Sequence, residues 1–87
     1  MEFDGKKQRN ALTAAENAIR ALARGDTKRA SANAMRAAEL DQIGVYAGFA
    51  GAVAGATEGG VAPDQWDGIA ATLDPGPLTF LIEELRS

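Results

Sequence analysis

Residues that commonly carry catalysis or bind metals are scarce in this 87-residue sequence. It contains no His and no Cys, so it lacks the commonest general base, the commonest metal ligand and any thiolate. Tyr46 and Glu58 have acid/base potential, but nothing pairs with them as an orienting partner. Asp64 and Asp67 could share a cation, yet further oxygen donors at the spacing of a calcium loop are missing. We therefore expect no enzyme, no metal site and no cofactor.

The glycine-rich stretch 48–60 invites a phosphate-binding interpretation. It lacks the Gly-Lys-Ser/Thr ending whose lysine and hydroxyl handle phosphate and magnesium, and no strand is expected before it. Its glycines have a different regularity, because Gly44, Gly48, Gly51 and Gly55 recur at the intervals of one helical stripe. Each glycine inside a helix costs about 1 kcal/mol relative to alanine, so the stripe predicts close packing against another helix. That helix would belong to this domain or, as the alternative, to a second copy in a homodimer.

Positive charge gathers in the first part of the chain. Residues 1–40 hold eight Lys and Arg against five Asp and Glu, whereas residues 41–87 hold one against seven. The two parts could attract each other within the fold or between subunits, or the basic part could face an acidic partner. The basic patch around the first turn comprises Arg20, Arg24, Lys28, Arg29 and Arg36. Because no aromatic stands among them to stack bases and the net charge is −3, nucleic-acid binding is the alternative function, not the leading one.

The last two helical segments, 63–73 and 77–86, have about the lengths of a helix-turn-helix motif. The second of them offers Glu83 and Glu84 with only Arg86. These carboxylates would repel phosphates, so the sequence argues against DNA recognition there.

Apolar residues recur with helical periodicity along most of the chain. The pattern predicts five helices and no strand, over residues 6–24, 27–40, 43–57, 63–73 and 77–86. Two alanine faces stand out, formed by Ala14, Ala18 and Ala21 in the first helix and by Ala30, Ala34, Ala37 and Ala38 in the second. Because Gly25 and Asp26 lie between these helices, we expect an antiparallel hairpin whose helices touch through alanines.

This hairpin resembles a tetratricopeptide repeat over about residues 8–42. The positions that match the family pattern are Gly25, Asp26, Ala30, Ala37, Glu39, Leu40 and Asp41. Two features depart from it, since Gln42 stands where the family has proline and the first helix lacks the large aromatic. In this family the first helix of each pair lines a concave groove that takes peptides. The resemblance implies that the corresponding apolar strip here is Leu12, Ala15, Ile19 and Leu22.

The chain is short enough for a single domain, 1–87, with residues 1–5 as a flexible N-terminus. We predict an all-α fold, a small bundle of about five helices built on the hairpin, with Tyr46, Phe49 and Val53 in its core. A turn is expected over 74–77, because its prolines exclude a continuous helix. No apolar signal segment precedes residue 10, and the longest apolar run, 43–56, is too short and glycine-rich to span a bilayer. We therefore expect a cytoplasmic protein without membrane contact.

The leading functional hypothesis is a small non-enzymatic module for protein–protein interaction, or a structural subunit. Its apolar strip would be covered by the C-terminal helix or would bind a partner helix, a peptide or a second copy of the chain. Trp66 is either a core anchor for the fourth helix or an exposed anchor for the partner. The partner and the pathway do not follow from the residues.

Overall fold

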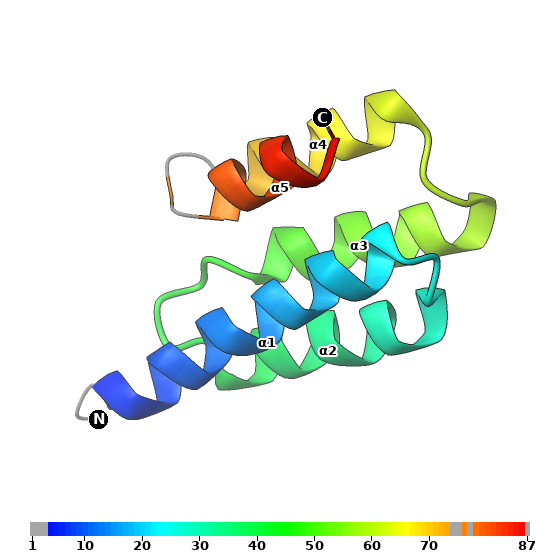
Figure 1. Ribbon diagram of the computed structural model, residues 1–87. Helices are drawn as coiled ribbons and strands as arrows, with labels where there is room; N and C mark the ends of the chain where they lie inside the picture. The colour runs from blue at the N-terminus through cyan, green and yellow to red at the C-terminus, as the bar shows by residue number, and fades with distance from the viewer. Residues whose placement is uncertain (1–3, 74–75, 77, 87) are drawn as a thin grey trace.

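Five α-helices follow one another in the computed structural model, which describes residues 4–73, 76 and 78–86 (Figure 1). They are α1 (Gly5–Ala23), α2 (Thr27–Leu40), α3 (Ala47–Gly59), α4 (Pro63–Leu73) and α5 (Leu78–Arg86). The described residues contain no strand, so the all-α prediction is confirmed. None of these helices has the length and the apolar character to cross a bilayer.

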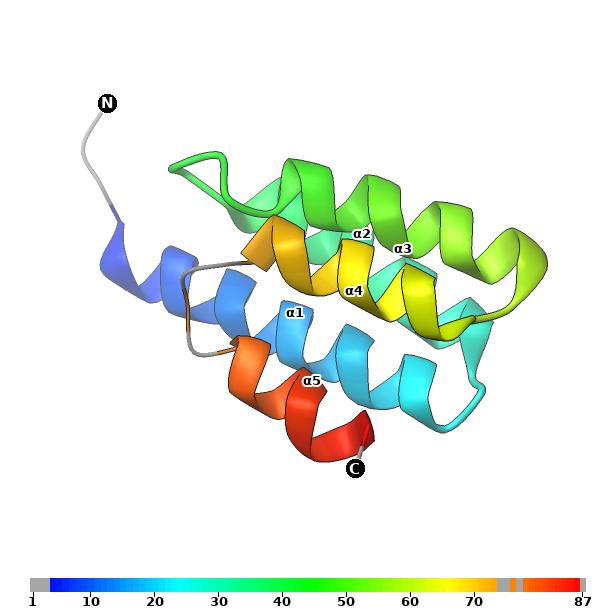
Figure 2. The same ribbon diagram turned by 90° about the horizontal axis from the view of Figure 1, so that it is seen from above.

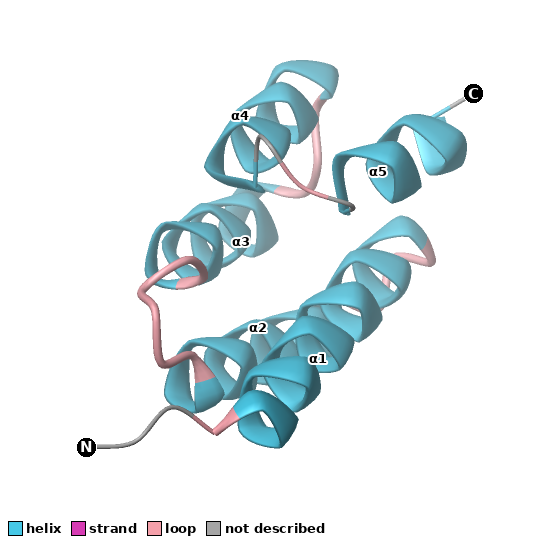
Figure 3. Cartoon of the chain, turned by 90° about the vertical axis from the view of Figure 1, so that its left-hand side faces the viewer, coloured by secondary structure: helices cyan, strands magenta, loops and turns pink. Residues whose placement is uncertain are grey.

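The helices form a closed ring around a common core. Each helix lies beside the helices that precede and follow it in the chain, and α5 closes the ring by packing against α1. The view along the helices shows this arrangement, with α1 and α2 on one side and α4 and α5 on the other (Figure 3). The largest fully buried side chains come from four of the five helices and are Ile19, Phe49, Val53, Ile69 and Ile82.

Alanine faces join α1 to α2. Ala14, Ala18 and Ala21 of α1 are buried, as are Ala30, Ala34 and Ala37 of α2, and the two helices pack against each other as a hairpin. Short side chains let the two backbones approach closely over most of the length of α2. The burial of these alanines and the packing of α1 on α2 agree with the predicted alanine contact, except that Ala38 is only half-buried.

The hairpin turns at a glycine in the left-handed conformation. Gly25 has φ +80°, and its N–H donates to the carbonyl of Leu22 while the N–H of Asp26 donates to the carbonyl of Ala21. This pair of bonds is the Schellman motif, which satisfies carbonyls at the end of α1. The Asp26 carboxylate then accepts the N–H of Arg29 and begins α2.

The N-terminus of α1 corrects one expectation. Asp4 caps the helix by accepting the N–H groups of Lys6 and Lys7, and Gly5 is the first helical residue. Residues 4 and 5 therefore belong to an ordered helix start, and residues 1–3 lie outside the described part.

The third helix begins later than its periodicity predicts. Residues 41–46 form a loop in which Gly44 adopts φ +77°, and Asp41 accepts the N–H groups of Ile43 and Tyr46. These bonds hold the backbone out of a helix up to Tyr46, the residue before α3, which itself makes no side-chain capping bond. Ile43 and Val45 consequently lie exposed in the loop.

Two glutamines fasten this loop to the start of α1. The Gln8 side chain donates to Asp41 over 2.9 Å and accepts the backbone N–H of Gln42 over 2.7 Å. The Gln42 side chain in turn accepts the N–H of Asp4 over 2.7 Å. A proline at position 42 would lack the N–H that donates to Gln8.

Candidate protein-interaction surface

The apolar strip predicted to bind a partner lies inside the molecule. Ala15, Ile19 and Leu22 are buried, and Leu12 is half-buried beside Leu78 and Leu81 of α5. Its assignment as an exposed peptide groove is wrong, because α5 closes the ring over α1 and the bulky flank of α1 fills the core. The strip is therefore covered by the C-terminal helix α5, which was the alternative to binding a partner.

Trp66 is half-buried and packs against the core beside the buried Ile69 and Leu73 of α4. Of the two interpretations, the structure supports the core anchor. An α4 capping bond helps to fix this helix, since the Gln65 side chain accepts the N–H of Ala62 over 2.8 Å.

The glycine stripe predicted to pack closely is open. Gly44 lies in the loop before α3, and Gly48, Gly51 and Gly55 are exposed. A Cβ added at Gly51 or Gly55 would meet no atom within 4 Å, and one at Gly48 would meet only the Thr72 side chain at ordinary contact distance. Close packing of these glycines within the domain is therefore wrong. The buried face of α3 is the opposite one, with Phe49 and the other predicted core residues.

The basic patch divides between two surfaces. Arg20, Arg24 and Arg29 border a polar hollow of about 450 Å³ between α1 and α2, together with Asn17 and Asn33. Lys28 and Arg36 instead line a groove on the other side of α2.

Two arginines of the polar hollow lie beside acids of their own helices. Arg20 pairs with Glu16 at 3.1 Å and Arg29 approaches Asp26 at 3.8 Å. These exposed pairs reduce the positive field that a nucleic acid would meet.

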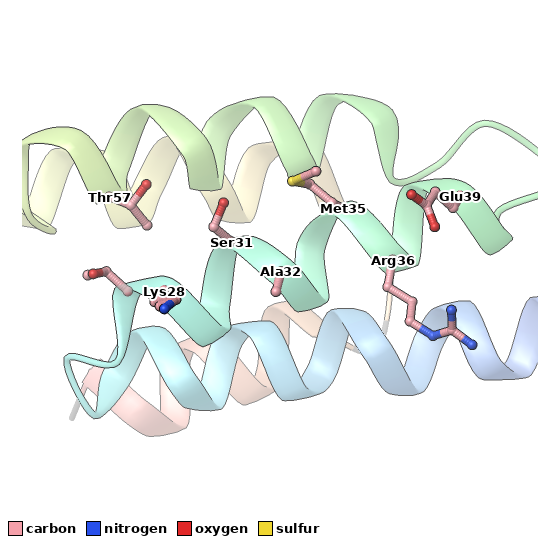
Figure 4. A pocket seen from close by; sticks show the side chains of 8 residues that line it. Lys28, Ser31, Ala32, Met35, Arg36, Glu39 and Thr57 are labelled. Carbon is pink, nitrogen blue, oxygen red and sulfur yellow. The ribbon is translucent and has the colours of Figure 1, made fainter.

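The larger groove, of about 720 Å³, follows α2 and is bordered by α3 (Figure 4). We call it the α2–α3 groove. Its lining residues are Thr27, Lys28, Ser31, Ala32, Met35, Arg36, Glu39 and Thr57. Met35 points toward α3, whereas Arg36 points toward α1 (Figure 4).

Met35 is the apolar centre of the α2–α3 groove. Its side chain is 58% exposed although it is one of the bulkier apolar residues of the chain. Lys28 and Glu39 lie toward the two ends of the groove, and Ala32 leaves a shallow site beside Met35. Protein-binding surfaces combine an apolar centre with a polar rim, and the α2–α3 groove has this arrangement around Met35.

Sequence reasoning missed Met35, although a signal for it exists. Lys28, Ala32, Met35 and Glu39 recur at intervals of four, three and four, which puts them on one stripe of α2 opposite the buried alanines. The regular alanines of α2 indicate its buried face, whereas the exposed face contributes only basic residues to the sequence analysis.

A smaller hollow of about 310 Å³ lies where α5 meets α1. Phe80 is 73% exposed there and stands beside Leu12 and Leu81. Glu16, Arg20 and Glu84 also line it. We call this the α1/α5 edge; α5 lies beside α1 on the side away from α2 and α3 (Figure 2).

The titratable groups with shifted pKa values belong to the loop before α3. Burial alone would raise the pKa of Asp41, but the hydrogen bonds from Tyr46, Gln8, Ile43 and Gly44 outweigh it and hold the pKa below its usual value. Burial and the nearby Asp41 charge raise the pKa of Tyr46. The Asp41 carboxylate holds the loop through these bonds, and the Tyr46 ring is buried beside Phe49, so both groups have structural roles here.

Comparison with known proteins gives no relative for this chain: no family model matches it, and no curated protein or solved structure is similar to it at the level searched.

Proposed function

We propose that this protein is a small non-enzymatic interaction module, or structural subunit, that docks another protein chain in the α2–α3 groove. The observation that carries the proposal is the exposure of Met35 in the middle of that groove. Methionine adapts its shape to a partner and is enriched in the centres of interfaces. The hairpin that presents it retains its proposed likeness to a tetratricopeptide repeat, with a different face offered to the partner.

The rim of the groove supports this proposal. Lys28 and Glu39 place charges of opposite sign toward the two ends of the groove, which favours one orientation of a docked chain over the other. The α3 border is low, because Ala50 and Ala54 share a helical stripe with Thr57 and carry only a methyl group each.

The polar hollow around Arg24 carries the alternative, a nucleic-acid-associated factor. It gives weaker support, since Glu16 and Asp26 lie beside two of its three arginines. Salt-sensitive binding of DNA or RNA that charge reversal at Arg24 and Arg29 abolishes would favour this alternative.

The decisive experiment compares three baits in a pull-down from the native cell extract, followed by native mass measurement. The baits are the wild-type chain, Met35→Glu in the groove, and Phe80→Glu as the matched control on the α1/α5 edge. Both substitutions replace an exposed apolar side chain with a carboxylate, so both variants should keep the helical circular dichroism of the wild type.

We expect one protein to be retained by the wild type and by Phe80→Glu and to be lost from Met35→Glu. The native mass then gives its stoichiometry. Equal recovery by all three baits would show that the α2–α3 groove is not the docking surface. Selective loss from Phe80→Glu would indicate that the partner docks on the α1/α5 edge instead.

A further inference from the structure

The charges on the outer face of α2 are placed against its own helix dipole. Lys28 lies in the first turn, where the positive end of the dipole disfavours a cation. Glu39 lies in the last turn, where the negative end disfavours an anion. Both side chains line the α2–α3 groove, and both are exposed. Alone, α2 is therefore less stable than it would be with these two charges exchanged.

An antiparallel helix laid along this face would reverse that disadvantage. Its C-terminal end, with the negative pole of its dipole, would lie beside Lys28, and its N-terminal end beside Glu39. Only a helix with an acid near its end and a base near its start would match both charges. The α2 helix of a second copy has this arrangement.

The spacing of the face makes the match self-complementary. Lys28 and Glu39 are equally far from the midpoint of residues 33 and 34, and so are Ala32 and Met35. An antiparallel pair of α2 helices therefore places Lys28 against Glu39 of the other copy, and Met35 against Ala32, at both ends of a two-fold axis. The intervals of four, three and four are those of a coiled-coil seam, in which a large side chain fits beside a small one.

We infer that the occupant of the α2–α3 groove is a second copy of this chain, docked through an antiparallel, two-fold pairing of α2 with α2. The inference rests on the proposed function, because it names the partner for the same groove. Arg36 does not oppose this pairing directly, since its side chain points toward α1 and away from Met35 (Figure 4).

The exposed face of α3 agrees with such a neighbour. A two-fold axis perpendicular to α2 in the plane of the interface keeps α3 of one copy on the same side as α3 of the other. The positions of α3 that border the groove, Ala50, Ala54 and Thr57, carry short side chains, whereas Gly48 lies on the side of α3 that faces Thr72 of α4. No bulky or charged side chain at the bordering positions obstructs the approach of a second molecule.

The stretch from Lys28 to Glu39 is about 17 Å long at 1.5 Å per residue, which is short for an interface. The pairing therefore belongs to the transient class, which buries less than about 1,200 Å² in total. We expect a dimer in reversible, concentration-dependent exchange with the monomer, and one that weakens at high salt because charges set its orientation.

Sedimentation velocity of the purified chain over a wide concentration range tests the inference with a charge exchange. Lys28→Glu and Glu39→Lys should each shift the chain to the monomer, because each puts like charges together twice. The double variant Lys28→Glu, Glu39→Lys restores opposite charges across the axis and should restore the dimer. Each single change improves the fit to the helix dipole, so thermal melting of both should show folded monomers, and misfolding will not imitate the result.

Several results would overturn the inference. A wild-type chain that is monomeric at every concentration excludes it, and so does a dimer that both single variants leave intact or that the double variant fails to restore. If the wild type is monomeric while Met35→Glu still loses a retained protein in the pull-down, the proposed function stands and only the identity of the partner is wrong. If substitutions in the groove change neither the pull-down nor the oligomeric state, both the proposed function and the proposed partner are wrong.

A disulfide experiment tests the antiparallel register, and the absence of native cysteine leaves no background. A mixture of Lys28→Cys and Glu39→Cys should form the mixed cross-linked dimer under mild oxidation. Each variant alone should form little, because identical positions lie about 17 Å apart along the paired helices. Efficient cross-linking of each variant with itself would indicate a parallel pair and would contradict the proposed register.

Discussion

At Gly25 the backbone has φ +80°, a conformation that costs a residue with a Cβ about 1–2 kcal/mol. A Cβ at this position would meet no atom within 4 Å, so the cost of a substitution comes from the backbone alone. Gly25→Ala should lower the free energy of unfolding by about 1–2 kcal/mol in urea titration. Gly25→Asn should lose less, because asparagine tolerates the left-handed region. Equal losses in the two variants would indicate a steric cause instead.

Asp41 gives the chain a defined response to acid. Its pKa is lowered in the folded state, so its contribution to stability is present above the unfolded value near 3.8 and is lost as pH falls through the folded value. We expect Asp41→Asn to be less stable than the wild type at neutral pH by about 1 kcal/mol, since an amide oxygen accepts these hydrogen bonds more weakly.

Denaturation as a function of pH measures this response. The difference in stability between wild type and Asp41→Asn should shrink below pH 3.8, as the wild-type carboxylate is protonated. Glu83→Gln, which changes an exposed carboxylate of α5 in the same way, is the matched control. A difference that stays constant from pH 7 to acid would contradict the role of the Asp41 charge.

At the scale of a helix, α3 has glycines that its own fold does not require. Gly51 and Gly55 are exposed, and a Cβ at either would find open space. Gly51→Ala and Gly55→Ala should therefore each raise the stability of the monomer by up to about 1 kcal/mol through helix propensity. Thermal melting at low protein concentration measures this gain. A loss of stability would reveal a close neighbour that the monomer does not contain.

Periodicity predicted the existence of every helix, and for α2 and α4 also the bounds that the structure has. It failed at the start of α3, because glycine at position 44 fits both a helical stripe and a left-handed loop residue. The choice depends on Asp41, whose hydrogen bonds to two following N–H groups hold the loop in place. These bonds are local, spanning two and five residues, but the spacing of apolar residues carries no information on them.

The candidate surface was harder to predict than the helices. Amphipathic spacing identified Ile19 and Leu22 as one apolar face, but a face that binds a partner and a face that another helix covers have the same pattern. Only the position of α5 distinguishes the two. Met35 is the one large apolar residue on the outer face of α2. A single apolar residue among polar ones is a weak sequence signal for a binding surface.

For the whole molecule, closure of the ring depends on α5. Leu78 and Ile82 are its buried side chains among those described, and Ile82 is fully buried. Ile82→Ala should lower the free energy of unfolding by about 2–5 kcal/mol, the range for removing a large core side chain. Phe80→Ala, on the exposed side of the same helix, should change it by less than about 0.5 kcal/mol. Similar losses from the two would mean that α5 does not seal the core in solution.

A nine-residue helix held by so few buried groups also sets the dynamics of the molecule. The free energy needed to lift α5 away from α1 is smaller than that needed to separate the alanine-packed hairpin, so its amides should exchange with deuterium earlier than those of α1 and α2. Each such opening briefly exposes Ile19 and its buried neighbours to water. Proteases and chaperones that survey exposed apolar segments would therefore meet this chain first at the α1/α5 seam, and the lifetime of the protein in a cell would follow the frequency of that local opening.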